Sequence, residues 1–280
     1  MTVVGFVGLG QIGSPMAERL LDAPGGLVVF DVRVEAVEPF AKKGARAAAD
    51  AAELGTECDV ISVMVRDDEQ VRDVVHAILR TARKGTVVAI HSTIRPETAE
   101  QLAAEAVPKG VDVIDAPVAG GFMGAAQGTL AVMAGGSAEA VDRCREAFGR
   151  WAELVVHVGP VGAGTRAKLA RNLLQFAAYS AAAEAQRLAE AAGIDLRTFA
   201  QVVRQSDKTT GGPGAIMLRP TTAPMDAGDP LHEILSHTRD LGEKDLRLAL
   251  ELGRALGVDL PFAELALERF ARGLGLEPGS

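Results

Sequence analysis

Three glycines near the beginning of the chain have the spacing of a loop that binds the phosphates of a nucleotide. They lie in the segment Gly8-Leu9-Gly10-Gln11-Ile12-Gly13, directly after an apolar run and before a helical pattern. In such a loop the first glycine permits a tight turn, the second lets backbone N–H groups approach a pyrophosphate, and the third lets helix and strand pack closely. The helix N-terminus adds partial positive charge. The segment therefore predicts a dinucleotide-binding loop.

Two charged residues after the second apolar run bear on the choice of dinucleotide. Asp31 follows Gly13 by eighteen positions (31 − 13), where a carboxylate accepts hydrogen bonds from the adenosine ribose. Asp31 favours NAD, because it would repel the 2′-phosphate of NADP. Arg33 could instead pair with that phosphate or stack on the adenine. We therefore predict NAD as the preferred cofactor and NADP as the alternative.

A lysine and an asparagine in the second half of the chain suit proton transfer to a substrate. Lys168 and Asn172 are four residues apart, so they share one face of a helix. The positive end of that helix, together with desolvation in a closed cleft, would lower the pKa of Lys168. Such a lysine can exchange a proton with a hydroxyl while a hydride moves. Lys168 is thus the predicted general acid/base, although an ordinary surface lysine has the same spacing.

Two segments that follow predicted strands could bind the substrate or the cofactor. The first is His91-Ser92-Thr93, and the second is Asp115-Ala116-Pro117-Val118-Ala119-Gly120-Gly121. Ligands bind open α/β sheets beyond the carboxyl ends of the strands. Gly120 and Gly121 offer successive unhindered N–H groups, which suit a carboxylate or another anion. An ordinary Pro/Gly turn is the alternative interpretation.

The histidines and cysteines predict no metal site. The five histidines lack the spacing of metal ligands, and Cys58 and Cys144 lie far apart without a CxxC pattern. We interpret both cysteines as core thiols of a protein in a reducing compartment.

The first half of the chain alternates β-branched runs with helical patterns, which is typical of βαβ units and a parallel sheet. Predicted strands cover residues 2–7, 27–30, 60–65, 86–90 and 111–115, with helices at 11–21, 68–81 and 96–106. Two later strands, at 129–134 and 154–156, flank a helix at 138–148 and extend the same sheet.

The second half reads as helical. A pattern of about 30 residues, 163–192, exceeds the usual length of globular helices. Further helices are predicted at 196–204, 237–256 and 262–272, and residues 206–230 look irregular. The expected fold is α/β: a Rossmann-type, doubly wound, mostly parallel sheet in residues 1–162, and an all-α domain in residues 163–280 joined by the long interdomain helix.

Composition limits the classes of partner. The 280 residues carry 37 acidic and 29 basic side chains, and 48% are hydrophobic. This excludes a disordered chain, and the acidic surface argues against nucleic acid and anionic membranes. No apolar run approaches the roughly 20 residues of a membrane span. We expect a soluble cytoplasmic protein that acts on a small molecule and forms a homodimer or homotetramer through its long apolar helix.

Four motifs together resemble the β-hydroxyacid dehydrogenase family, which includes 3-hydroxyisobutyrate dehydrogenase. They are GFVGLGQIGSPMA at the start, DAPVAGG after the fifth strand, GAGTRAKLARN at the domain junction and EKDLRLAL near the end. The resemblance covers nearly the whole chain. It implies an NAD(P)-dependent oxidoreductase that interconverts a 3-hydroxy acid and its semialdehyde, with the active site between the two domains.

The resemblance also implies roles for individual residues. Lys168 would handle the hydroxyl proton, and Asn172 would hydrogen-bond the substrate. Gly120 and Gly121 would bind the substrate carboxylate through their amides. Lys244, supported by Asp245, would approach the cofactor side of the cleft from the second domain. Ser92 and Thr93 would lie near the nicotinamide ribose.

Three positions depart from the family pattern. Ala119 stands where the family has serine, which removes one hydrogen bond to the carboxylate, a loss of roughly 10- to 100-fold in affinity. His237 replaces an apolar aromatic residue on the substrate side, and Arg171 replaces an asparagine. These changes leave two alternatives: reduction of an imine or bulky ketone on the same fold, and an NAD-binding module without turnover.

Overall fold

The computed structural model describes residues 1–277, which divide into two compact units. The first unit comprises Met1–Arg171, and the second begins at Asn172. The helix α8 (Ala163–Ala191) begins in the first unit and continues into the second. The predicted domain boundary after Gly162 thus lies at the beginning of α8, and the division between the compact units lies within it.

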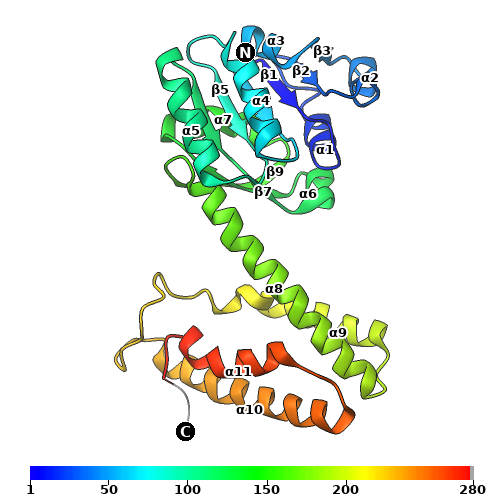
Figure 1. The fold of residues 1–280 in the computed structure, drawn as a ribbon, viewed down its shortest axis with the longest axis vertical. Coiled ribbons are helices and arrows are strands. Elements are labelled where there is room, and N and C mark those ends of the chain that lie inside the picture. Colours follow the sequence, from blue (N-terminus) through cyan, green and yellow to red (C-terminus); the bar gives the residue numbers. More distant parts are fainter. Residues whose placement is uncertain (278–280) are drawn as a thin grey trace. The chain divides into compact units, whose positions relative to one another are not determined.

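A mostly parallel sheet forms the centre of the first unit (Figure 1). Its order is β3-β2-β1-β4-β5-β6-β8-β7, with β9 paired to β8. The strands from β3 to β6 are parallel, whereas β8 is antiparallel to β6 and β7 and parallel to β9. The bounds are β1 Val4–Val7, β2 Leu27–Phe30, β3 Arg46–Ala47, β4 Val60–Val63, β5 Val87–Ile90, β6 Asp112–Asp115, β7 Val118–Ala119, β8 Leu130–Gly135 and β9 Ala152–Gly159. The predicted sheet, including its two late strands, is confirmed.

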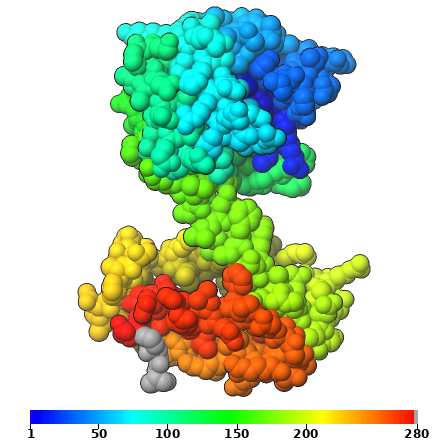
Figure 2. Space-filling model, viewed as in Figure 1, coloured from blue at the N-terminus to red at the C-terminus, as the bar shows by residue number. Residues whose placement is uncertain are grey.

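Helices cover both faces of this sheet through two separate hydrophobic clusters. One cluster holds the apolar sides of α1 (Gly13–Glu18), α2 (Val34–Lys42), α6 (Gly121–Gln127) and α7 (Ala138–Phe148). The other holds those of α3 (Ala51–Glu57), α4 (Asp68–Leu79) and α5 (Pro96–Ala106). Figure 2 shows α4 and α5, in cyan and blue-green, covering the near face. This is the doubly wound arrangement that the sequence predicts.

Several short elements were not predicted from the sequence. β3 and β7 have two residues each, which is too short for a period-two pattern. α2 contains Pro39, a residue that usually marks the end of a helix, and α6 begins at Gly121. Residues 115–121, for which a Pro/Gly turn was the alternative interpretation, contain the end of β6, the strand β7 and, after Gly120, the first residue of α6.

The described residues of the second unit contain helices and no strand. After α8 come α9 (Leu196–Thr210), α10 (His232–Leu256) and α11 (Pro261–Gly273). The buried carboxylate of Glu184 on α8 accepts the N–H groups of Phe262 and Ala263, at 2.9 and 3.1 Å, and so caps α11. No helix among the described residues is long and apolar enough to cross a membrane.

The prediction of an irregular segment at residues 206–230 is wrong for its first residues, which are helical. α9 continues to Thr210 and ends at Gly211, whose φ of 89° is the left-handed conformation of a helix C-cap. A short 3₁₀ helix, η2 (Gly212–Ile216), follows.

The fully buried His91 links three strands of the first unit. Its Nδ1–H donates to the Ala116 carbonyl, at 2.7 Å, and its Nε2 accepts from the Ser62 hydroxyl, at 3.0 Å. The rings of Phe148 and Trp151 pack against it at centroid distances of 5.2 Å. Burial lowers the pKa of His91 from 6.5 to about 4. His91 is therefore neutral and structural.

We predict that His91 makes the protein less stable in acid. Between pH 6.5 and 4 the unfolded chain binds a proton at His91 that the folded chain does not, so stability falls as the pH drops. A difference of 2.5 pKa units (6.5 − 4) corresponds to about 3 kcal/mol. Chemical denaturation at pH 7 and at pH 4 measures the free energy of unfolding that is lost on acidification. This loss should be smaller in His91→Asn than in the wild type by about 3 kcal/mol. An equal loss in both proteins would contradict it.

Candidate active site

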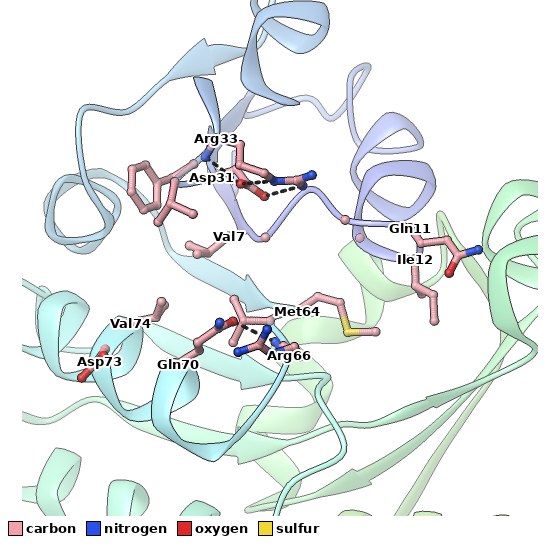
Figure 3. Close-up of a pocket in the computed structure, with 16 residues that line it drawn as sticks. Val7, Gln11, Ile12, Asp31, Arg33, Met64, Arg66, Gln70, Asp73 and Val74 are labelled. Atoms are coloured by element: carbon pink, nitrogen blue, oxygen red, sulfur yellow. Dashed lines mark hydrogen bonds and ion pairs between the residues drawn. The ribbon is translucent and has the colours of Figure 1, made fainter. Parts of the chain in front are cut away.

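A cavity of about 850 Å³ opens at the carboxyl ends of β1, β2 and β4 (Figure 3). Its volume is in the range of ligand-binding sites. It is lined by Asp31, by Arg33 and by every residue of the predicted loop Gly8–Gly13 except Leu9. Residues of α4 and of the segment after β4, which the motifs did not indicate, also line it. The lining consists of Val7, Gly8, Gly10, Gln11, Ile12, Gly13, Phe30, Asp31, Val32, Arg33, Met64, Val65, Arg66, Gln70, Asp73 and Val74.

The three glycines of the first motif meet different constraints. Gly8 has a φ of 93°, and a Cβ there would collide with the backbone carbonyl of Met64. A Cβ on Gly13 would collide with the carbonyl of Gly8. A Cβ on Gly10, in contrast, would meet no atom of the described residues within 4 Å. Protein packing therefore requires Gly8 and Gly13, whereas Gly10 leaves space open beside the cavity.

Asp31 and Arg33 form an ion pair at one wall of the cavity (Figure 3). The Asp31 carboxylate accepts the N–H of Leu9 at 2.7 Å, the N–H of Arg33 at 2.9 Å and Arg33 Nε at 3.2 Å. Burial by itself would raise the pKa of Asp31, but these hydrogen bonds outweigh it and hold the pKa below its ordinary value. The wall thus carries a permanent negative charge whose arginine partner is already engaged.

Met64, Arg66 and Gln70 lie at the opposite wall in Figure 3. Ser92 fixes this wall, because its hydroxyl donates to the Val65 carbonyl at 2.7 Å and accepts the Val65 N–H at 2.9 Å. Ser92 is buried and Thr93 is exposed, and neither lines the cavity. Their predicted contact with the cofactor stays a prediction, whereas the support of Val65 by Ser92 is a role that the sequence did not indicate.

Lys168, on the second turn of α8, lies against the segment between β6 and α6. Its Nζ donates to the Val118 carbonyl at 2.6 Å. Burial, and then the positive charge of Arg171, lower the pKa of Lys168 from 10.5. The direction agrees with the sequence prediction, and burial, the larger cause of the lowered pKa, is one of the two causes predicted.

Val118, which Lys168 contacts, precedes the paired glycines by two positions in the chain. Ala119 follows in β7 and is half-buried, and Gly120 and Gly121 are exposed, with φ of 129° and 61°. Side chains other than glycine rarely adopt these conformations. Lys168 therefore contacts the strand that leads into Gly120 and Gly121, whose backbone conformations only glycine adopts without strain.

The remaining predicted residues belong to the second unit. Asn172 is half-buried on α8, and His237 and Lys244 are exposed on α10, seven residues apart (244 − 237) and so on one face. Lys244 pairs with Asp245 at 3.1 Å. Within residues 1–277, no group of three His, Cys, Asp or Glu side chains is arranged to hold a metal ion.

Comparison with known proteins identifies the family. Residues 3–159, more than half of the chain, match the model for the NAD binding domain of 6-phosphogluconate dehydrogenase. The NAD-dependent L-serine dehydrogenase of Pseudomonas aeruginosa is 34% identical over 96% of this chain and 91% of its own. The chain belongs to the β-hydroxyacid dehydrogenase family. It is an NAD(P)-dependent oxidoreductase acting on CH–OH groups, which excludes the module without turnover.

Other members are also similar over nearly their full length. An uncharacterized oxidoreductase of Mycobacterium tuberculosis is 58% identical over 98% of this chain and 93% of its own. The structure of a 3-hydroxyisobutyrate dehydrogenase from the same species, with L-serine, has a TM-score of 0.69 and 32% identity and covers 97% of this chain and 93% of its own. Imine reductases with 18% or 19% identity share the fold alone.

We predict that Gly10→Ala weakens cofactor binding without destabilising the protein. A methyl group at Gly10 fits the protein but occupies open space beside the cavity, so NADH affinity should fall about 10-fold with an unchanged Tm. Gly13→Ala is the matched control, since its collision with Gly8 should lower the Tm. Fluorescence titration and thermal unfolding measure both effects. Wild-type affinity in Gly10→Ala would contradict the assignment of this cavity.

Proposed function

We propose that the protein interconverts a 3-hydroxy acid and its semialdehyde with NAD(H), and that Lys168 exchanges the hydroxyl proton. This proposal rests on the half-buried Lys168 ammonium, which donates to the Val118 carbonyl two residues before Gly120. The glycine loop and Asp31 fit a dinucleotide, because they leave open space and a carboxylate where a pyrophosphate and a ribose need them.

Lys168 alternates between two protonation states during turnover. In oxidation, its neutral amine accepts the proton of the substrate hydroxyl, and in reduction its ammonium returns that proton to the carbonyl oxygen. The nicotinamide, when bound, accepts or supplies the hydride. A lowered pKa increases the fraction of neutral Lys168 near neutral pH, which favours oxidation. Val118 holds the ammonium until a substrate hydroxyl replaces its carbonyl.

The proposed substrate class rests on Gly120 and Gly121, which directly follow β7. The N–H groups of Gly120 and Gly121 suit an anionic head group, and we propose a carboxylate. Relatives named for L-serine, 3-hydroxyisobutyrate and 2-(hydroxymethyl)glutarate support a 3-hydroxy acid. The proposed roles of Ala119 and Asn172 toward the substrate, and of Lys244 toward the cofactor, rest on their positions in the motifs. The proposed role of His237 rests on its place on the substrate side in the family pattern.

Imine or bulky ketone reduction is the second candidate. Ala119 favours it, because the side chain offers no hydroxyl to a carboxylate, whereas the retained Lys168 argues against it. An activity screen in which a cyclic imine is reduced faster than every semialdehyde would reverse this order.

We also propose that the protein is a homodimer or homotetramer. Leu173, Phe176 and Tyr179 on α8 are 74%, 59% and 61% exposed in the single chain, and α10 exposes Leu241, Leu248 and Leu252. Apolar side chains so exposed on neighbouring turns support association with a second copy. Sedimentation that finds only monomer at micromolar concentration would contradict it. The cytoplasmic location likewise stays a prediction.

We predict that Lys168→Ala lowers kcat by roughly 10²- to 10⁴-fold, the usual contribution of a general acid/base. Lys168→Arg should be similarly inactive, because a guanidinium keeps the charge but does not release its proton at neutral pH. NADH affinity should not change, since Lys168 does not line the cavity. The exposed Lys109→Ala is the control for loss of a surface lysine. Wild-type turnover of a hydroxy-acid panel by Lys168→Ala would remove the proposed role.

We predict that Asp31→Ser shifts the ratio of kcat/KM for NAD over NADP toward NADP by roughly 10- to 100-fold. The charge that repels a 2′-phosphate disappears, and Arg33 is released from its ion pair. The exposed Asp142→Asn, on α7, should leave the ratio unchanged. An unchanged ratio in Asp31→Ser would show that Asp31 does not select the cofactor.

A further inference from the structure

We propose that Asp115 is a positioning residue for Lys168. The inference rests on the proposed function of Lys168 and gives Asp115, the first residue of the DAPVAGG motif, a role of its own. Asp115 is the last residue of β6 and is fully buried. It lies outside the cavity, so its effect on catalysis would pass through the elements that it joins.

The Asp115 carboxylate fixes the beginning of α8. One oxygen accepts the N–H of Gly162 at 2.7 Å, and the other accepts the N–H of Thr165 at 2.6 Å. Gly162 directly precedes α8, and Thr165 lies in its first turn, where N–H groups lack partners within the helix. Lys168 follows Thr165 by three residues, nearly one turn. The carboxylate therefore sets both the place and the rotation of the turn that carries Lys168.

Close backbone contact leaves this helix end little freedom to move. A Cβ on Gly164 would collide with the carbonyls of Met133 and Asp115, and a Cβ on Gly135 would lie 2.7 Å from the Gly164 nitrogen. α8 thus begins directly against the backbone of β6 and β8. Glycine at both positions permits this approach.

The same aspartate begins the segment that Lys168 contacts. Ala116 donates its N–H to Ile90 at 2.7 Å, and its carbonyl accepts His91 Nδ1 at 2.7 Å. Val118 follows two residues later and accepts Lys168 Nζ. A closed ring of contacts therefore runs from Asp115 through Val118 to Lys168, and back along α8 to Asp115. Its two side-chain links hold the ammonium beside Gly120 and Gly121.

Asp115→Asn tests this coupling because it keeps the shape of the side chain. The amide retains one acceptor oxygen and turns an NH₂ group toward an N–H donor, so one link to α8 is lost. A small displacement of a catalytic group costs up to about 10²-fold in rate. We expect kcat to fall roughly 10- to 100-fold, with NADH affinity within twofold of wild type. The exposed Asp112→Asn, on the same strand, is the matched control and should retain wild-type kcat.

A double-mutant cycle with Lys168→Ala separates positioning from general damage. If Asp115 acts through Lys168, adding Asp115→Asn to Lys168→Ala should change the residual kcat by less than about twofold. An equal fall in both backgrounds, or wild-type kcat in Asp115→Asn, would overturn the inference while leaving the role of Lys168 intact. Wild-type kcat in Lys168→Ala alone would instead refute the proposed function. If Asp115→Asn does not fold, Asp115→Glu, which keeps the charge but moves its oxygens, takes its place with the same expected results.

Discussion

A buried carboxylate joins the sheet of the first unit to the helix that carries Lys168. Burial raises the pKa of Asp115, and the backbone donors of Thr165 and Gly162 oppose that rise. A buried carboxylate is unfavourable unless it is hydrogen-bonded, and the free end of α8 supplies the donors. The contact thus gives hydrogen-bond partners both to the Asp115 carboxylate on β6 and to the backbone N–H groups at the beginning of α8. We propose that the position of Lys168 against Val118 depends on this contact.

The cofactor side of the first unit is built on a different principle. Its wall at β1 and β2 is local in sequence: a glycine loop and, shortly after it, Asp31, which is held ionised by the backbone and by Arg33. We propose that charge and open space there decide which dinucleotide fits. The surroundings of Lys168 depend instead on hydrogen bonds between segments far apart in the sequence, such as that between Asp115 and Thr165, which are 50 positions apart.

This difference explains how much could be predicted from the sequence. α5 and α7 have the predicted bounds, because proline at the start of one helix and Ser137 before the other act locally. The wall formed by Met64 and Arg66 carries no motif, and Ser92 supports it across 27 residues. The role of Asp115 likewise depends on the tertiary fold. Sequence patterns singled out Lys168 as a candidate. Its contact with the Val118 carbonyl could not be predicted from them, because it depends on where β7 lies in the fold.

The fold holds Lys168 half-buried against Val118, and we propose that Lys168 exchanges a proton there. The most direct test is the pKa of Lys168 itself, followed in the free protein by NMR of lysine labelled at Cε, with Lys168→Arg to assign the signal. We expect Lys168 to titrate below 10.5, the ordinary lysine value, because it is half-buried. A titration at or above 10.5 would contradict it.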